Sequence, residues 1–321
     1  MCEVRSMDIR KEGADIMKKT KRVIGMLAGT FAIIGIVLIV VGALMGGIKV
    51  VSSDAMSGRL TIGTDAVVGV DVFTDEDYDN MTSIEERSTF DSAEVKEVEF
   101  EAEYGEFQIV SWEHSYYEIK GESSGAANRI KYALEDGALK LRMKGKRVSV
   151  FGDNVKATLY VPEDAVIDEF RIEVGAGELL CKDISGIQRL KVNIGAGEGT
   201  FSNITADYVD MSVGAGDGNV ENAQFGNSNF NVGVGDLDVH GMITGNVVID
   251  CGIGGMDVEL VNSYDDFNYK VSVGLGEVSL DEEKYSGSID NREIDNEEDK
   301  KITIRCGIGD VSVDFNKALY D

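Results

Sequence analysis

Apolar and polar positions alternate in a repeating pattern along residues 170–313. A Gly-x-Gly motif recurs seven times there, at intervals of 20, 19, 19, 19, 22 and 33 residues. Apolar side chains stand one, three and five residues before almost every first glycine. Alternation with a period of two is typical of a strand with one buried face. The seven first glycines are Gly175, Gly195, Gly214, Gly233, Gly252, Gly274 and Gly307.

The alternation continues through the residue between the two glycines and then slips by one position. In the fourth repeat, for example, the next apolar residues are Leu237 and Val239. A slip of this kind indicates a bulge or corner, and the second glycine supplies a backbone that tolerates a positive φ. Each repeat therefore predicts one coil of two or three short strands. Coils stacked in chain order, at the strand spacing of about 4.8 Å, would share one continuous core.

An imperfect copy of the pattern precedes the seven repeats, at residues 98–109, with Glu103 in place of the first glycine. Four further strands are predicted between this copy and Gly175, and Asp136-Gly137 reads as a hairpin turn between the middle two. These strands span residues 116–120, 130–134, 139–143 and 156–161. The sequence therefore predicts an all-β, single-stack β-solenoid over residues 95–316, with coils of about 19–20 residues.

Residues 23–48 contain no charged side chain, and this run of 26 residues is long enough to cross a bilayer. Four basic residues, among them Lys18 and Arg22, precede it, so the positive-inside rule places residues 1–22 in the cytoplasm and the rest outside. A cleaved signal peptide is the alternative, although its apolar region would be shorter. Met17 is an alternative start of the anchor. The predicted organisation is a tail (1–22), a transmembrane helix (23–48), an acidic spacer (49–94) and the solenoid.

Two G-x-x-x-G pairs, Gly25/Gly29 and Gly42/Gly46, lie in the predicted helix. This spacing permits close approach of two helices, so a helix-mediated homodimer stays open.

The formal net charge is -27, and all of this excess lies beyond the predicted helix. Residues 49–321 carry 24 basic and 54 acidic side chains. Such a domain repels nucleic acid and anionic lipid headgroups. The expected partners are therefore the membrane, through the helix, and a cell-wall, glycan or protein partner outside it.

No motif of enzyme chemistry is present. The Gly-x-Gly motifs lack the third glycine and the following helix of a dinucleotide-binding loop, and strand-like sequence follows each one. Neither His114 nor His240 has a second histidine at metal-ligand spacing, and no G-x-S-x-G motif occurs. We therefore expect no enzyme, no catalytic residue and no cofactor.

Acidic residues follow the second glycine of six repeats, and stacked coils would bring them into one line of like charge, here named the acid ladder. Calcium could relieve their repulsion, but calcium-binding β-rolls use a nine-residue repeat. We expect a solvated edge without a metal site. The acid ladder consists of Glu178, Glu198, Asp217, Asp236, Glu277 and Asp310.

Cysteine and aromatic residues complete the candidate chemistry. Cys251 and Cys306 occupy a position that valine or isoleucine fills in other coils, and chain order would place them two coils apart, about 10 Å, too far for a disulfide. Trp112, Tyr116 and Tyr117 cluster after the first coil. They could stack on glycans, although packing in the core is the commoner role.

These G-x-G-[DE] turns behind an N-terminal anchor resemble the DUF4097 family, described as putative adhesins of Gram-positive bacterial surfaces. The resemblance covers about residues 90–315 and is strongest in Ile249–Leu260 and Ile304–Phe315. Tyr285-Ser286-Gly287 and Ile289-Asp290-Asn291 are similar to the family's insert, whereas Gly255 departs from the acidic position. The family implies a β-solenoid at the cell envelope and no catalytic residues.

Two functions follow as expectations. The first is a membrane-anchored, extracellular, non-catalytic binding or adhesin-like module. The alternative is a membrane-anchored cell-envelope stress sensor or regulator that works through a membrane partner.

Overall fold

The structure is a computed structural model that describes residues 59–61, 67–69, 78, 80–84, 86–122, 130–144, 155–281, 283–287 and 289–315. Within these residues no helix is both long and apolar enough to span a bilayer. The predicted transmembrane helix, residues 23–48, lies outside them, as do the cytoplasmic tail and part of the spacer.

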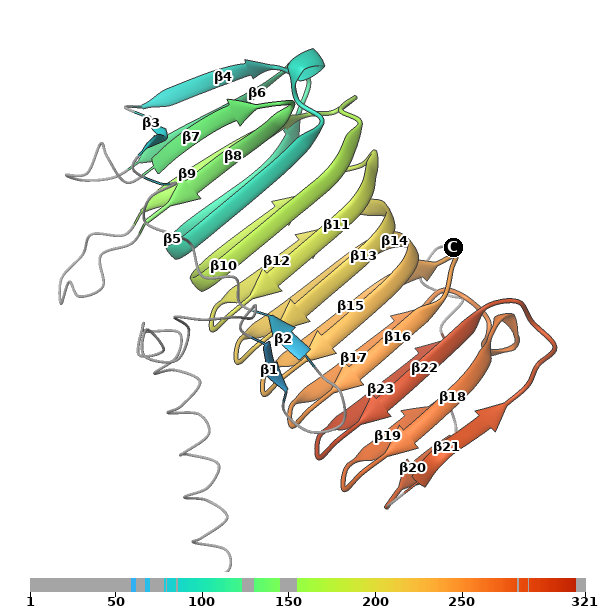
Figure 1. Ribbon diagram of the computed structural model, residues 1–321. Helices are drawn as coiled ribbons and strands as arrows, with labels where there is room; N and C mark the ends of the chain where they lie inside the picture. Colours follow the sequence, from blue (N-terminus) through green and yellow to red (C-terminus); the bar gives the residue numbers. More distant parts are fainter. Residues whose placement is uncertain are drawn as a thin grey trace, which may run out of the picture. The chain divides into compact units, whose positions relative to one another are not determined.

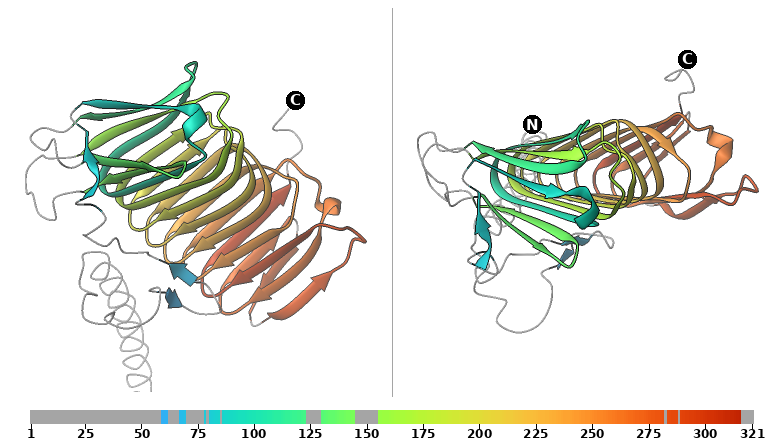
Figure 2. Two further views of the ribbon diagram at one scale, coloured as in Figure 1. Left: turned by 45° about the horizontal axis from the view of Figure 1, so that its top comes forward. Right: turned by 90° about the horizontal axis from the view of Figure 1, so that it is seen from above.

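The described part is all-β, and nearly all of its strands belong to one hydrogen-bonded sheet of 21 strands. This sheet bends into two layers, here named sheet A and sheet B, that face each other across a common core (Figures 1 and 2). Sheet A contains, in spatial order, β3 (Thr82–Ser83), β7 (Ile130–Glu135), β8 (Ala138–Met143), the first parts of β5 (Glu97–Trp112) and β10 (Ile167–Lys182), β11 (Ile187–Ile194), β13 (Thr205–Val213), the last part of β14 (Asp217–Val232), β16 (Val247–Cys251), β22 (Lys301–Cys306), β18 (Asn268–Val273) and β21 (Ile289–Ile294).

Sheet B is built from the strands that follow each turn. It contains, in spatial order, β4 (Arg87–Asp91), β6 (Tyr116–Glu122), β9 (Lys156–Pro162), the last parts of β5 and β10, β12 (Glu198–Ser202), the first part of β14, β15 (Asp236–Ile243), β17 (Gly255–Leu260), β23 (Asp310–Phe315), β19 (Glu277–Leu280) and β20 (Glu283–Ser286). A separate pair, β1 (Arg59–Thr61) and β2 (Val67–Gly69), and two 3-10 turns, η2 (Ser92–Glu94) and η3 (Tyr264–Asp266), complete the described elements.

Parallel pairing between successive coils has the register that the repeat predicts. Val192 lies opposite Ile172 on one side and Met211 on the other, steps of one coil each. All three side chains are at most 1% exposed. The repeat thus folds as stacked β-solenoid coils around a continuous apolar core, and the strands predicted at 116–161 and the Asp136-Gly137 hairpin are also confirmed.

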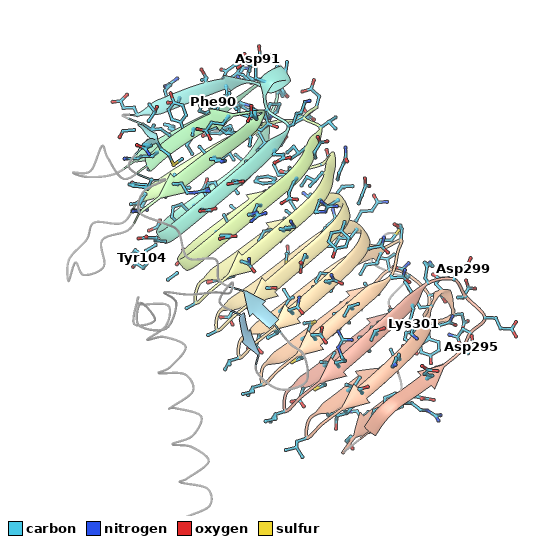
Figure 3. All side chains as sticks on the ribbon, viewed as in Figure 1. Phe90, Asp91, Tyr104, Asp295, Asp299 and Lys301 are labelled. Atoms are coloured by element: carbon cyan, nitrogen blue, oxygen red, sulfur yellow. The ribbon has the colours of Figure 1, made fainter. Side chains whose placement is uncertain are left out.

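The residue between the two glycines does not continue the inward alternation, which corrects the sequence interpretation. Leu275 is 82% exposed and Ile308 is 58% exposed, because the chain bends there to pass from sheet A to sheet B. Tyr104, the equivalent residue of β5, projects from the same edge (Figure 3). The bend turns this position toward solvent and resumes the inward pattern only three residues later.

The second glycine is required mainly by close stacking. Among the second glycines of the seven Gly-x-Gly motifs, only Gly177 has a φ in the left-handed range, at +135°. By contrast, a Cβ on Gly216 would lie 2.0 Å from the carbonyl oxygen of Gly197 in the preceding coil. The absence of a side chain lets the backbones of neighbouring turns approach within hydrogen-bonding distance.

A corner after sheet B is formed by residues that tolerate the left-handed backbone conformation. Asp183, Asn203 and Asn222 have φ of 60°, 57° and 52° in three successive coils. Asn and Asp adopt this conformation more readily than other non-glycine residues. Their side chains also bond to one another: Asn203 donates to Asp183, and Asn222 Nδ2 donates to Asn203 Oδ1 at 2.6 Å.

The stacking order departs from chain order at the C-terminal end. The last coil, β22 and β23, pairs with β16 and β17 on one side and with β18 and β19 on the other. It is therefore inserted between two coils that precede it in the sequence (Figure 1). The 33-residue step before Gly307 makes this possible, because β20 and β21 first run antiparallel along the outer edges of β19 and β18.

Antiparallel strands cover both ends of the stack: β3 and β4 at one end, β20 and β21 at the other. Covered ends protect a solenoid from adding further strands edge to edge. β3 and β4 lie within the predicted spacer, and Ile84 and Phe90 are buried in the core. The core therefore extends N-terminally beyond residue 95, because these residues cover the open edge of β6 and β7.

Candidate functional site

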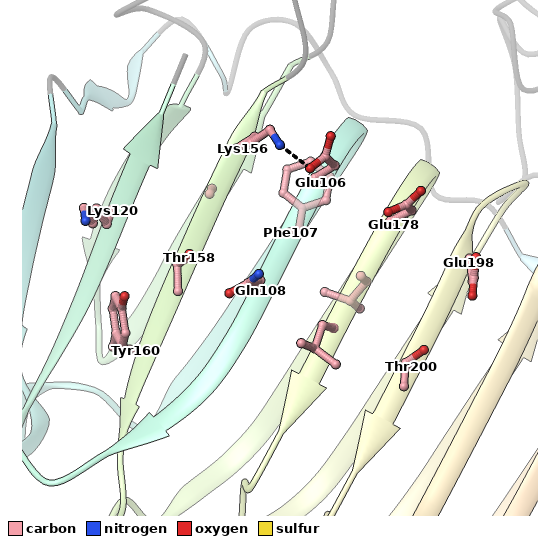
Figure 4. Close-up of a pocket in the computed structure, with 13 residues that line it drawn as sticks. Glu106, Phe107, Gln108, Lys120, Lys156, Thr158, Tyr160, Glu178, Glu198 and Thr200 are labelled. Atoms are coloured by element: carbon pink, nitrogen blue, oxygen red, sulfur yellow. Dashed lines mark hydrogen bonds and ion pairs between the residues drawn. The ribbon is translucent and has the colours of Figure 1, made fainter.

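A groove of about 560 Å³ lies on the outward face of sheet B, near the N-terminal end of the stack (Figure 4). It crosses β6, β9, β5, β10 and β12, which lie side by side. Its lining consists of Glu106, Phe107, Gln108, Lys120, Lys156, Ala157, Thr158, Tyr160, Glu178, Leu179, Leu180, Glu198 and Thr200.

Period-two alternation places the polar lining on the outward face. On β9, Lys156, Thr158 and Tyr160 alternate with Ala157 and Leu159, which are buried. Glu106 and Gln108 of β5 lie opposite Lys156 and Thr158 in the parallel register. The groove is therefore formed by outward rows of side chains from strands that are distant in the sequence.

The charges in the groove are mixed. Lys156 Nζ contacts Glu106 Oε2, and Lys120 extends from the neighbouring strand β6 (Figure 4). Glu178 and Glu198 stand on the opposite side. With the Gln108 amide and the Thr158 and Thr200 hydroxyls, the groove offers both hydrogen-bond donors and acceptors. Such a lining suits a ligand rich in hydroxyl or amide groups.

Aromatic rings adjoin the groove at Tyr160. The Trp112 ring stacks on Tyr160, with centroids 4.8 Å apart and an angle of 27° between the planes. Tyr116 and His114 pack edge-on against the same indole, at 4.9 and 4.5 Å. The Trp112 Nε1–H donates to the carbonyl oxygen of Tyr116 at 2.8 Å, which fixes the orientation of the indole. We name Trp112, His114, Tyr116 and Tyr160 the aromatic cluster.

The three aromatic residues predicted to cluster, Trp112, Tyr116 and Tyr117, do not share one environment in the structure. Trp112 and Tyr116 are only partly buried and belong to the aromatic cluster, whereas Tyr117 is 1% exposed and belongs to the core. Burial raises the pKa of the Tyr117 hydroxyl. Sequence reasoning missed Tyr160 as a partner of Trp112, because the pairing of β9 with β5 has to be known first.

The acid ladder forms as a continuous line of neighbours. Glu106, Glu178, Glu198, Asp217 and Asp236 are successive register partners, and the line passes Gly255 to Asp310 and Glu277. Gly255 lacks a carboxylate, and its N–H donates to Asp236 Oδ1 at 2.7 Å. Among the described residues no group of three or more His, Cys, Asp or Glu side chains has the arrangement of a metal site.

The outward face of sheet B is also acidic across β15, β17 and β23. Asp238, Asp257 and Ser312 follow one another across three neighbouring strands, and His240, Glu259 and Asp314 form the next row. Partial burial, reinforced by the charges of Asp238 and Asp314, raises the pKa of Asp257. His240 lies within β15 and not at a turn; its Nε2 is 3.9 Å from Glu259 Oε2.

Sheet A carries a different outward face, in which acids are matched by bases. Arg142 contacts Glu99 at 2.8 Å and Glu101 at 2.7 Å. Burial raises the pKa of Glu101 to about 8 although the Arg142 charge opposes the rise. At Glu169, burial also acts to raise the pKa, but hydrogen bonds from Lys191 and Arg171 outweigh it and lower the value to about 2. This network ties neighbouring strands together.

These observations define a class of protein: a β-solenoid with covered ends and a polar, aromatic-flanked groove on one outward face. The chain belongs to the Toastrack DUF4097 family, whose model matches residues 48–314. The resemblance inferred from the Gly-x-Gly turns is thereby confirmed. Among curated proteins, sequence comparison detects no relative of this chain.

Several solved structures are similar to parts of this chain at low identity. A putative cell adhesion protein from Clostridium sporogenes shares 16% identity with a TM-score of 0.34, covering 73% of this chain and all of its own. A putative adhesin from Bacteroides fragilis shares 13% identity with a TM-score of 0.40, covering 71% of this chain and 95% of its own. One from Parabacteroides distasonis shares 10% identity with a TM-score of 0.35, at the same coverage. Similarities this weak say nothing about the function of the chain.

Proposed function

We propose that this protein is a membrane-anchored, extracellular binding module whose groove on sheet B takes a neutral polysaccharide, and that it acts without catalysis. The observation that carries the proposal is the position of Tyr160. Its ring lies in the groove and stacks on Trp112, beside rows of amide, hydroxyl and carboxylate side chains. Aromatic faces and hydrogen-bonding side chains together match a sugar, which has apolar C–H faces and hydroxyl edges.

The charge of the chain selects among polysaccharides. The domain beyond the predicted helix has far more acidic than basic residues, and the acid ladder runs from the groove along the stack. Anionic polymers would be repelled by this face, whereas a neutral polymer meets no such barrier. The positive charge of Lys156 is neutralised by Glu106 within the groove, and this ion pair also favours an uncharged ligand.

The location follows from the sequence. The uncharged segment 23–48 and the basic residues before it favour an anchor with the solenoid outside the cell. A binding module held at the surface by one helix fits a role in contact with wall or host polysaccharide. The alternative, an envelope stress sensor with a membrane partner, stays a prediction that no described residue specifically favours.

Co-sedimentation of the full-length protein, purified in detergent, with insoluble polysaccharides tests the proposal. We expect retention on neutral polymers and none on polyanionic ones at physiological salt. Replacing Tyr160 with Ala should weaken retention about tenfold, equivalent to about 1.4 kcal/mol, by removing the stacking surface. Tyr208→Ala, which removes an outward tyrosine of sheet A, is the matched control and should bind normally. Failure to bind any neutral polysaccharide, or equal loss in both variants, would contradict the proposal.

A further inference from the structure

Cys251 and Cys306 are direct neighbours in the stack, although chain order would separate them by one intervening coil. They are register partners on the paired parallel strands β16 and β22, because the last coil is inserted next to the coil of Cys251. Opposed residues on neighbouring strands have Cα atoms about 4.8 Å apart, and disulfides span about 4.4–6.8 Å between Cα atoms. The geometric objection raised from the sequence therefore does not apply.

The two cysteine side chains lie in the same inward row of the core. Both side chains point into the core and are 2% exposed. A Cβ on Gly309 would lie 2.9 Å from the Cys251 sulfur, so this sulfur already leans toward the coil that carries Cys306. Cys251 Sγ donates to the carbonyl oxygen of Gly254 at 3.1 Å, and Cys306 Sγ donates to that of Gly309 at 2.8 Å. A Cβ on Gly276 would lie 2.8 Å from the Cys306 sulfur, so this sulfur leans toward the coil of β18 and β19, and Cys306 has to change rotamer to reach Cys251.

An ion pair fixes the register beside the cysteines. Arg305 donates through Nε and Nη2 to the two carboxylate oxygens of Asp250, at 2.5 and 2.7 Å. Asp250 and Arg305 are themselves register partners, one position before Cys251 and Cys306. A two-pronged contact of this kind holds two strands in one alignment, and the same alignment keeps the thiols opposed.

We propose that Cys251 and Cys306 form a disulfide that joins the inserted last coil to the coil beside it. In the reaction the two thiols lose two protons and two electrons, and one S–S bond forms between them. The electrons and protons pass to a disulfide oxidant, such as oxidised glutathione or a thiol–disulfide oxidoreductase, whose own S–S bond is reduced to two thiols. Because both thiols are buried in the finished fold, the bond forms as the last coil docks.

The disulfide would stabilise the attachment of the two C-terminal coils to the rest of the stack. Among the strands that the structure describes, the coil formed by β18 and β19 is paired to the rest of the stack only through β22 and β23. If the last coil leaves, the coil of β18 and β19 loses its neighbour as well. A bond from Cys251 to Cys306 retains the last coil and closes a long loop that includes β17 to β21.

Oxidative refolding of the full-length protein in detergent tests the proposal. The chain is unfolded, refolded with reduced and oxidised glutathione, alkylated in denaturant and mapped by mass spectrometry. We expect a peptide pair that links Cys251 to Cys306 and separates on reduction, with label only on Cys2 and Cys181. The Cys181→Val variant should keep the link. The Cys251→Val, Cys306→Val double variant should fold without it, because valine fills this position at Val213 and Val232.

A natively folded chain with four labelled cysteines, or one with Cys181 in the disulfide, would overturn the proposal. The same map made on chain extracted from the envelope of expressing cells, and alkylated before reduction, answers the question if refolding fails: the linked peptide supports the proposal, and four labels contradict it. A reductant should lower the thermal midpoint of the wild-type protein by several degrees and leave that of the double valine variant unchanged.

Discussion

Backbones of successive coils approach one another most closely at the second glycine of each turn. A Cβ there would lie 1.6–2.3 Å from a carbonyl oxygen of the neighbouring coil at Gly197, Gly216, Gly235 and Gly254. Sequence reasoning recognised these glycines but attributed them to a positive φ. The distinction depends on the distance between coils, which a single sequence does not contain.

Replacing Gly216 with Ala should therefore destabilise the protein. The new methyl group has to push the Gly197 carbonyl away, at a cost of about 1–3 kcal/mol. Urea unfolding followed by circular dichroism measures this cost. Ala215→Ser changes the neighbouring outward residue and should have little effect. A Gly216→Ala variant as stable as the wild type would show that the coils stack less tightly than described here.

Glu101 gives the protein a dependence of stability on pH. Its pKa rises from 4.5 to about 8 in the folded protein because of burial, so the folded state holds its proton more tightly than the unfolded state. This contribution is fully present below pH 4.5, decreases as the pH rises toward 8, and is lost above it. Glu101→Gln cannot ionise, and Arg142 keeps its contact with Glu99.

We expect the Glu101→Gln variant to resemble the wild type near pH 5 and to exceed its unfolding free energy at pH 9, by on the order of 1–3 kcal/mol. Urea titrations at the two pH values measure the difference. Glu135→Gln, at an exposed position of β7, which β8 separates from β5, serves as the control. An equal effect of Glu101→Gln at both pH values would show that Glu101 is ionised throughout.

The elements were largely predictable from alternation, because one buried face imposes a period of two on every strand. The hairpin of β7 and β8 was predictable from Asp136-Gly137, whose positive φ values suit the turn. The order of the last two coils was not predictable from the sequence. Both coils carry the same repeat, so either could pair with β16 and β17. Only the antiparallel course of β20 and β21, which covers the edges of β19 and β18, excludes chain order.

Truncation after residue 300 tests this order of elements. It removes β22 and β23, with which β18 and β19 pair in parallel. We expect rapid proteolysis C-terminal to β17, detected as a stable fragment by mass spectrometry. Truncation after Phe315 retains both strands and should resist the protease. If the shorter chain protects β18 and β19 as well as the longer one, the inserted position of the last coil is wrong.

Charge acts on the molecule as a whole. The acid ladder and the rows of Asp238, Asp257, Glu259 and Asp314 place many like charges on one face of sheet B. Screening this repulsion should raise the thermal midpoint as sodium chloride is added. At matched ionic strength, calcium and sodium should give the same midpoint, and Asp257→Asn should reduce the salt effect. A clearly higher midpoint with calcium would indicate a specific cation site.

The site was less predictable than the fold. Trp112 and Tyr116 were recognisable as candidates from their type and proximity in the sequence, whereas the groove joins β6, β9, β5, β10 and β12. Tyr160 and Glu178 line the same groove only because β9, β5 and β10 pair side by side. Outward positions alternate like inward ones but carry no common residue type, so the sequence alone gives no signal for the groove.

Trp112 is the only tryptophan of the chain and stacks on Tyr160 at the groove, so its fluorescence tests the binding claim most directly. We predict that a neutral polysaccharide, titrated into the full-length protein, shifts the Trp112 emission to shorter wavelength in a saturable way. The Tyr160→Ala variant should show no saturable shift, and a polyanionic polysaccharide should leave the wild-type emission unchanged. A neutral polysaccharide that co-sediments with the protein without altering Trp112 emission would place its binding elsewhere and contradict the account.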